Sequence, residues 1–390
     1  MSKPIYLDHN ASTPVLSEVM DAMLPFLREH FGNPSSAHAY AVPARTAIAN
    51  ARRQVAALIG GDEDEIVFTS GGTEANNLAI RGVAEARIDR RRIVTTVIEH
   101  PAVSQPCAWL QQHGYDITRI GVDATGRSRI DQARHAIDAN TALVTVMHSN
   151  SETGTLQPVR EIAELARANG ATMHTDAAQS VGKVPVNVQE LGVDLLSVVG
   201  HKMYAPKGVG ALYVRRGTPL VPVTFGAGHE RGLRPGTENV AYIVGLGTAC
   251  AIAARDLETI ALRLKCLRDA LWARLAASIP DLALHGDLEH RLPNTLNVRF
   301  PRVSGNAVLA HTPEVAASTG SACHAGDEKP SAVILAMGIA PQEALGAVRL
   351  TLGRGTTDDD VTRAADVMIR GWSAATARTG LNSIVSTTSA

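Results

Sequence analysis

The stretch Glu65-Ile-Val-Phe-Thr-Ser-Gly-Gly-Thr-Glu74 decides the fold. Apart from Glu65, its first five residues are apolar or β-branched, which favours a short buried strand. The turn Ser70-Gly-Gly-Thr73 follows, and the residues from Glu74 to about Arg87 have the composition of a helix. A strand that passes through a glycine-rich turn into a helix is typical of an α/β domain with a mostly parallel sheet.

Short apolar runs repeat this unit on the C-terminal side, with helix-like segments such as Val159–Ala168 between several of them. The runs are residues 93–98, 142–147, 171–175, 194–199 and 209–214. On the N-terminal side, a helix is predicted over residues 44–59, ended by Gly60-Gly61. Strands that alternate with helices predict a sheet covered by helices.

The C-terminal third has a different pattern, which predicts a smaller α+β unit. A long helical region over 240–277 leads to it. The predicted strands are 294–300 and 347–352, and the predicted helices are 331–337 and 358–375. We therefore expect a large domain over residues 15–255 and a small domain made of residues 1–14 and 256–375. Residues 376–390 are rich in Ser and Thr and are expected to form a disordered tail.

The composition excludes several classes of protein. The 390 residues include 37 Lys and Arg against 38 Asp and Glu, so no basic excess indicates nucleic-acid binding. The chain opens without a signal peptide, and we expect no segment that could span a membrane. Four cysteines without a C-x-x-C pair argue against a structural metal or a disulfide framework. A cytoplasmic protein is expected, in which Cys107, Cys250 and Cys266 are packing residues.

Two segments could hold a cofactor. The Ser70-Gly-Gly-Thr73 turn offers free N–H groups at a helix start to a phosphate, although an ordinary tight turn would have the same sequence. Asp176 follows an apolar run and would lie at the carboxyl edge of the sheet, where it could keep a heterocyclic nitrogen protonated. A helix-capping role is the alternative for this aspartate.

Two further residues could carry covalent chemistry. Lys202 lies in Gly200-His-Lys202 after the apolar run Leu195–Val199, where loss of solvent would favour a neutral, nucleophilic amine. A lone lysine is more often a solvated surface residue, but this one follows the phosphate-type turn and Asp176. Cys323 lies among small and polar residues, a setting that suits an exposed, reactive thiol.

Together these motifs resemble those of the cysteine desulfurases and selenocysteine lyases, which use pyridoxal phosphate on the class V aminotransferase fold. The resemblance runs from Tyr6 to about residue 372. Its markers are Phe31-Gly-Asn-Pro-Ser-Ser36, Phe68-Thr-Ser-Gly-Gly-Thr-Glu74, Glu99-His100, Asp176-Ala-Ala-Gln179, Gly200-His-Lys202, Arg231, Arg234-Pro-Gly-Thr-Glu-Asn239, Gly320-Ser-Ala-Cys323 and Arg349-Leu-Thr-Leu-Gly-Arg354. It implies fold type I, with a large mostly parallel-sheet domain and a smaller α+β domain.

The resemblance also implies a role for each matching residue. Lys202 resembles the lysine that carries the cofactor as a Schiff base, Cys323 the nucleophile, and His100 the residue stacked on the ring and suited to proton transfer. The implied cofactor contacts are Asp176 at the ring nitrogen, Gln179 at the phenolic oxygen, and Gly72, Thr73 and His201 at the phosphate. Thr237 resembles a phosphate contact drawn from a partner subunit, so a homodimer is implied. Arg349 resembles the residue that grips the substrate carboxylate, and Asn33 and Asn150 complete the candidate substrate-binding set.

Two positions depart from the family pattern. Ser151 stands where members usually have an asparagine near cofactor and substrate, in Asn150-Ser-Glu152. Val199 stands where members usually have a serine on the phosphate, so one hydrogen bond worth about 1 kcal/mol is missing. Ser151 and Val199 both count among the cofactor-binding candidates. Because both depart from the family pattern, they leave the identity of the substrate open.

The resemblance implies a cysteine desulfurase, which converts L-cysteine to L-alanine and leaves a persulfide on Cys323 for a protein acceptor. The alternative is a selenocysteine lyase, whose pattern Arg291-Leu-Pro-Asn-Thr295 and Val199 resemble, whereas Pro101 after His100 favours the desulfurase. Another pyridoxal-phosphate β-lyase or aminotransferase, or a catalytically silent scaffold protein, is less favoured.

Overall fold

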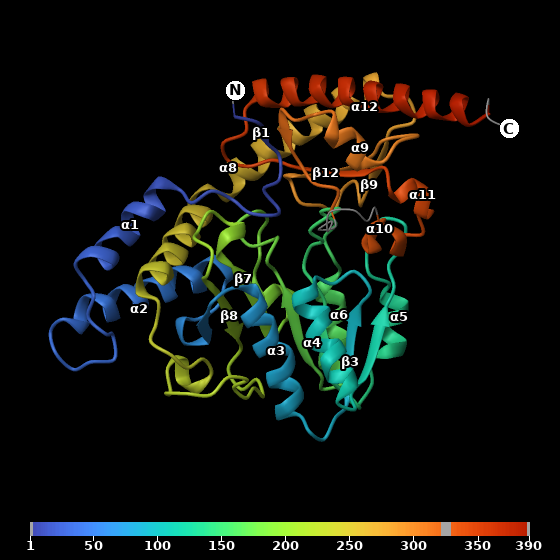
Figure 1. Ribbon diagram of the computed structural model, residues 1–390. Coiled ribbons are helices and arrows are strands. Elements are labelled where there is room, and N and C mark those ends of the chain that lie inside the picture. Colours follow the sequence, from blue (N-terminus) through green and yellow to red (C-terminus); the bar gives the residue numbers. More distant parts are fainter. Residues whose placement is uncertain (1–2, 321–328, 388–390) are drawn as a thin grey trace.

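A seven-stranded sheet forms the body of the molecule in the computed structural model, which describes residues 3–320 and 329–387 (Figure 1). Its strand order is β2-β8-β7-β6-β5-β3-β4. The strands are β2 (Ile66–Thr69), β3 (Arg92–Thr96), β4 (Asp116–Ile120), β5 (Thr141–Thr145), β6 (Thr172–Asp176), β7 (Leu195–Val199) and β8 (Gly210–Val214). Only β8 runs antiparallel to its neighbours, so the expected mostly parallel sheet is confirmed.

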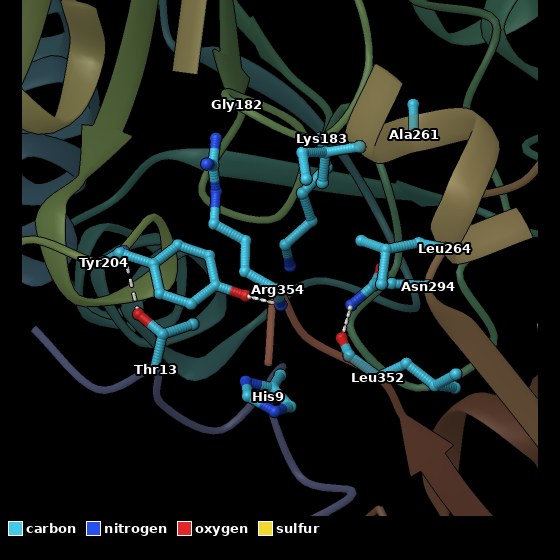
Figure 2. A pocket seen from close by; sticks show the side chains of 11 residues that line it. His9, Thr13, Gly182, Lys183, Tyr204, Ala261, Leu264, Asn294, Leu352 and Arg354 are labelled. Atoms are coloured by element: carbon cyan, nitrogen blue, oxygen red, sulfur yellow. Dashed lines mark hydrogen bonds between the residues drawn. The ribbon is translucent and has the colours of Figure 1, made fainter. Parts of the chain in front are cut away.

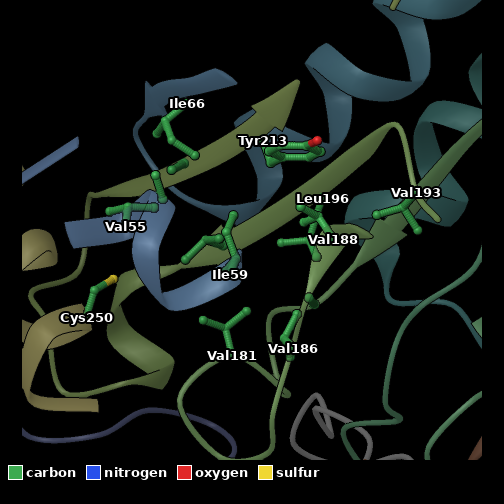
Figure 3. Packing of buried hydrophobic residues seen from close by; sticks show 14 of the residues in the cluster. Val55, Ile59, Ile66, Val181, Val186, Val188, Val193, Leu196, Tyr213 and Cys250 are labelled. Atoms are coloured by element: carbon green, nitrogen blue, oxygen red, sulfur yellow. The ribbon is translucent and has the colours of Figure 1, made fainter. Parts of the chain in front are cut away.

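Helices cover both faces of this sheet, which explains why β5, β6 and β7 are buried along their whole length. One face packs on α1 (Ser17–Arg28), α2 (Ala41–Ile59), α6 (Val159–Ala168), α7 (Val188–Leu191) and the start of α8 (Val240–Ser278). The other face packs on α3 (Gly72–Ala86) and α4 (Pro101–Gln112). Figure 3 shows the first of these cores, where Val55 and Ile59 of α2 meet Ile66, Leu196 and Tyr213 of the sheet.

A smaller unit lies beyond the carboxyl ends of the parallel strands of the large sheet (Figure 1). Its antiparallel sheet has the order β12-β10-β9, formed by β12 (Ala347–Thr351), β10 (Thr295–Arg299) and β9 (Ala283–His285). Beside it, β1 (Ile5–Tyr6) pairs in parallel with β11 (Val315–Ala316). The helices are the end of α8, α9 (Gly305–Ala310), α10 (Ala332–Ala336), α11 (Pro341–Ala344) and α12 (Asp358–Thr387), while α5 (Ile130–Ala136) flanks the large sheet.

Separate hydrophobic cores lie in the two units. The cluster around β6 and β7 draws on residues from Val19 to Ala253, whereas the cluster of the small unit draws on Ile5, Leu7 and residues from Leu264 to Met368. The expected boundary at residue 255 falls inside the continuous helix α8, and its position stays a prediction. Helix α12 continues to Thr387, where the sequence predicted a tail from residue 376.

Two expectations about α8 were wrong. Cys266 is exposed, whereas Cys107 and Cys250 are buried as predicted. The buried residues Leu264, Leu267, Leu271 and Leu275 lie on one side of the helix, and the helical period turns Cys266 to the other side. Part of α8 is also long and apolar enough to cross a bilayer by length and composition. Half of that stretch is buried, and α8 packs on α1, α2 and α12 as a core helix does.

A buried ion pair fixes the segment that leads into α8. Glu230 has a positive φ of 45° and is buried. Its two carboxylate oxygens accept hydrogen bonds from the Arg52 guanidinium at 2.6 and 2.8 Å, and the backbone N–H of Phe68 donates to it at 2.8 Å. This carboxylate therefore joins α2, β2 and the segment before α8.

We expect the substitution Glu230→Ala to lower the free energy of unfolding by about 3 kcal/mol, because it leaves Arg52 partly buried without its partner. Glu164→Ala, which breaks the exposed Arg160–Glu164 pair, should change it by less than about 0.5 kcal/mol. Denaturant unfolding of the two variants checks both values, and equal losses would contradict this assignment.

Candidate functional site

The candidate residues gather at the carboxyl ends of the parallel strands, facing the small unit. Asp176 is the last residue of β6, and Lys202 follows β7 in a short 3-10 turn over Gly200–Lys202. His100 follows β3 and Ser151 follows β5. Because parallel strands end at the same edge of a sheet, residues far apart in sequence meet there. This edge is where open α/β sheets bind their ligands.

Asp176 is buried and held in one orientation. The Asn76 side chain, on α3, donates from Nδ2 to Oδ2 of Asp176 at 2.7 Å. The backbone N–H of Ala178 donates to Oδ1 at 3.0 Å. Both contacts leave part of each carboxylate oxygen free to accept another donor, such as the protonated nitrogen of a ring.

The amine of Lys202 is held by backbone carbonyls rather than by a carboxylate. Its Nζ donates to the carbonyl oxygens of Asn10 at 2.7 Å and Ala11 at 2.8 Å. Burial, followed by the positive charge of Arg349, lowers the pKa of Lys202 to about 8. About a tenth of the amine is therefore neutral at pH 7, far more than for a lysine with the usual pKa, and the neutral form is the nucleophile.

Two histidines flank Lys202. The imidazole of His100 caps α4, where its Nδ1 accepts from the backbone N–H of Ala102 at 3.1 Å. Burial lowers the pKa of His100, so the ring is neutral with its proton on Nε2. The Nδ1 of His201 lies 3.3 Å from the Ser12 hydroxyl. Burial and then the charge of Lys202 lower the pKa of His201 to about 4.

The predicted phosphate turn lies against the end of β7. Helix α3 begins at Gly72, and its first turn presents N–H groups at its N-terminus. A Cβ atom at Gly72 would lie 2.6 Å from Cγ2 of Val199, so only glycine fits beside this valine. Thr73, the next residue, is exposed. The structure thus places Gly72 against Val199, and the exposed Thr73 follows Gly72 in the chain.

Arg349 reaches this edge from β12 of the small unit. Its Nη2 donates to Oδ1 of Asp8 at 2.7 Å, and its Nη1 donates to the carbonyl of Ser151 at 3.2 Å. The Nε atom is buried and has no hydrogen-bond partner among the described residues. A guanidinium with one buried N–H unused is suited to a carboxylate of a bound molecule.

Three other candidates lie apart from this cluster. The buried Asn150 accepts from the N–H groups of Glu152 and Thr153 through its Oδ1, so it shapes its own turn. Asn33 lies in the exposed loop between α1 and α2, where it accepts from the N–H of Ser35. Thr237 is exposed in the segment before α8.

Cys323 lies outside the described residues, but the chain on either side of it is described. The N–H of Arg349 donates to the Ser318 carbonyl at 2.6 Å, which brings the preceding segment beside the arginine. On the following side, the Ser331 hydroxyl donates to Oε2 of Glu152 at 2.5 Å. A Cβ at Gly320 would lie 2.5 Å from the same oxygen. The two flanking segments therefore meet at Glu152, close to the Arg349 end of the site.

Sequence analysis missed the residues that hold the site together, namely Asn10, Asn76 and Lys183. Asn10 accepts from Lys202 and from Nε2 of Gln179 through its backbone oxygen, at 2.7 and 2.9 Å. Its side chain contacts Lys183 at 3.0 Å and Thr295 at 2.9 Å. None of these residues belongs to a periodic pattern or a charged cluster, and only their contacts across the fold reveal them.

Comparisons with known proteins agree with this geometry. Residues 5–364 match the family model described as aminotransferase class-V. The chain is 45% identical over 366 residues to a cysteine desulfurase of Trichormus azollae, which covers 93% of this chain and 92% of the relative. It is 45% identical over 373 residues to the cysteine desulfurase IscS of Dictyoglomus turgidum, with 95% of each chain covered.

A solved structure described as a NifS-like protein superposes with a TM-score of 0.88 at 35% identity, over 94% of this chain and 98% of that one. The similarity thus spans both units and the region at the carboxyl ends of the strands where the candidate residues lie. The chain belongs to the class-V aminotransferase family, and within that family to the cysteine desulfurases.

Proposed function

We propose that this protein is a pyridoxal-phosphate-dependent cysteine desulfurase that converts L-cysteine to L-alanine and leaves the sulfur as a persulfide on Cys323. One observation carries the proposal. A lysine with a lowered pKa and a fixed aspartate lie at the ends of neighbouring strands, opposite an arginine whose buried Nε–H has no partner among the residues that the structure describes. The kinship with cysteine desulfurases supports the same substrate class.

The residues present fit the cofactor. Lys202 would attach it covalently, Asp176 would pair with the ring nitrogen and Gln179 with the phenolic oxygen, and His100 would lie over the ring. The start of α3 at Gly72 and Thr73, together with His201, would hold the phosphate. Gly72 packs directly on the Val199 side chain, whereas a Cβ at the neighbouring Gly71 would meet nothing within 4 Å, so the open space for a phosphate lies at Gly71. When bound, the cofactor supplies an electron sink for the charge that develops at the substrate Cα.

Three side chains would orient the substrate and transfer its protons. Arg349 binds the substrate carboxylate and so orients Cα towards Lys202. The neutral amine of Lys202 would remove the Cα proton. His100, neutral and protonated on Nε2, is suited to donate or accept a proton on the same face.

The sulfur is removed by the thiolate of Cys323. It attacks the substrate sulfur, a sulfur–sulfur bond forms, and the bond between Cβ and sulfur breaks. The electron pair of that bond stays with Cβ, which takes up a proton. Lys202 returns a proton to Cα, and alanine leaves. The persulfide then passes to a protein acceptor, in the cytoplasm by this proposal.

Thr237 supports a homodimer in this proposal. Its hydroxyl belongs to an exposed segment before α8 and makes none of the described hydrogen bonds. In this proposal it would contact the phosphate bound by a partner subunit. Selenocysteine lyase is the second candidate, because Val199 and Ser151 depart from the desulfurase pattern at the cofactor.

Attachment of the cofactor to the apoprotein should become faster as pH rises and level off near pH 8. Below that pH the Lys202 amine is protonated, so its nucleophilic fraction falls about tenfold per pH unit. Stopped-flow absorbance at a series of pH values checks this profile, with Lys202→Ala as the control that should form no covalent link. A rate that kept rising to pH 10 would contradict the lowered pKa.

Substitution of Arg349 by lysine should raise KM for cysteine about tenfold or more, because a point charge replaces a planar fork whose buried Nε–H has no partner among the described residues. Steady-state kinetics at saturating cofactor measures this effect. Arg299→Lys, on the neighbouring strand β10, removes an arginine paired with Glu343 and should leave KM unchanged. Equal KM for wild type and Arg349→Lys would remove the arginine from the substrate site.

Alanine formation from cysteine and from selenocysteine, measured side by side, tests the proposed function. We expect turnover of cysteine, a mass increase of one sulfur atom on Cys323, and loss of that increase in Cys323→Ser. Turnover of selenocysteine alone would favour the lyase. Undiminished cysteine turnover in Cys323→Ser would indicate another β-elimination chemistry.

A further inference from the structure

Lys183 is a buried lysine that forms no ion pair with the described residues. Its Nζ donates to the side-chain oxygens of Asn10 at 3.0 Å and Gln179 at 2.7 Å. Burial, followed by the positive charges of Lys202 and Arg349, holds the pKa of Lys183 well below its usual range. A neutral amine has two hydrogens, which matches the two acceptors.

The position of Lys183 follows from the turn after β6. Its backbone N–H donates to the carbonyl of Ser180, and Val184 N–H donates to the same oxygen. This helical turn places Lys183 four residues after Gln179 on the same face. Figure 2 shows the Lys183 amine pointing into the interior between His9 and Asn294, where a cavity of about 20 Å³ adjoins it.

Lys183 determines which end of the Gln179 amide faces Lys202. The Gln179 oxygen accepts from Lys183, and its nitrogen donates to the Asn10 carbonyl at 2.9 Å, the same oxygen that accepts from Lys202. A flipped amide would place its oxygen against the Asn10 carbonyl and its N–H groups against the lysine donors. The two facing oxygens could not form a hydrogen bond, and Lys183 would lose the acceptor for one of its N–H groups, so Lys183 and the Asn10 carbonyl together favour the observed orientation.

We propose that Lys183 is a positioning residue, which holds Gln179 so that the second hydrogen of its amide nitrogen is available to the phenolic oxygen of the cofactor. The inference rests on the proposed function, because it assumes that the cofactor ring lies beside Gln179. A hydrogen bond donated to the phenolic oxygen draws electron density from that oxygen. The oxygen then attracts less strongly the proton on the nitrogen that links Lys202 to the cofactor. Lys183 therefore lowers the pH at which this proton is lost.

The test is a double-mutant cycle on the cofactor-loaded protein, read as the pH midpoint of its visible absorbance band. Lys183→Met should raise the midpoint by about 0.5 to 1 pH unit, the effect of one lost hydrogen bond. Gln179→Leu should raise it at least as much. Adding Lys183→Met to Gln179→Leu should produce no further shift, because Lys183 acts through Gln179.

Equal shifts from Lys183→Met in both backgrounds would overturn the inference, since the lysine would then act by its charge or by general packing. No shift in the wild-type background would also overturn it. Lys265→Met, which replaces an exposed lysine paired with Asp269 on α8, is the matched control and should not move the midpoint.

Lys183→Gln keeps an N–H donor near Gln179 and covers the case in which Lys183→Met does not fold. It should shift the midpoint by less than Gln179→Leu does, and an equal or larger shift in a folded Lys183→Gln protein would count against the inference. Failure of the proposed function is distinguishable, because wild type and Lys202→Ala would then show the same spectrum. A band that depends on Lys202 but not on Lys183 would reject the positioning role alone.

Discussion

The hydrogen bonds of Asn10 are the contacts on which the site depends. Its backbone oxygen accepts from Lys202 and Gln179, which belong to the large unit. Its N–H and Nδ2 donate to Thr351 and Thr295, which belong to the small sheet. Because one residue holds both groups, the amine of Lys202 and the strand that carries Arg349 keep a fixed relation to each other. In the proposed function, this link holds the amine of Lys202 and the guanidinium of Arg349, which belong to separate units, in the fixed geometry that catalysis requires.

Burial does most of the chemical tuning around this centre. Lys202, His100 and His201 all have a lowered pKa for which loss of solvent is the largest cause. Neighbouring cations add to that effect, and the carbonyls of Asn10 and Ala11 hold Lys202 without supplying a full opposite charge. The site thus favours neutral bases, which suits proton removal from a carbon atom. Asp176 places a carboxylate at the end of β6, where Asn76 and the N–H of Ala178 fix its orientation.

Local patterns predicted the large sheet well, because its strands are continuous buried runs. The predicted segments 194–199 and 209–214 differ by one residue from β7 and β8. Strand β4 was missed because it lies at the edge of the sheet and only Ile117 and Ile120 are buried in it. Lys202, Asp176 and Gly72 could be identified because each follows a recognisable strand. Asn10 and Lys183 could not, since their roles come from contacts that no local pattern encodes.

The contacts of Asn10 also have a consequence for the order of events during synthesis. Its partner Thr295 lies 285 positions later in the chain, and Thr351 lies 341 positions later. At ribosomal speeds of roughly 5 to 20 residues per second, the asparagine waits some tens of seconds for them. Helix–strand units of the large sheet can form meanwhile from nearer contacts. The site itself matures last, so a chain arrested before β12 would have most of its sheet but no functional centre.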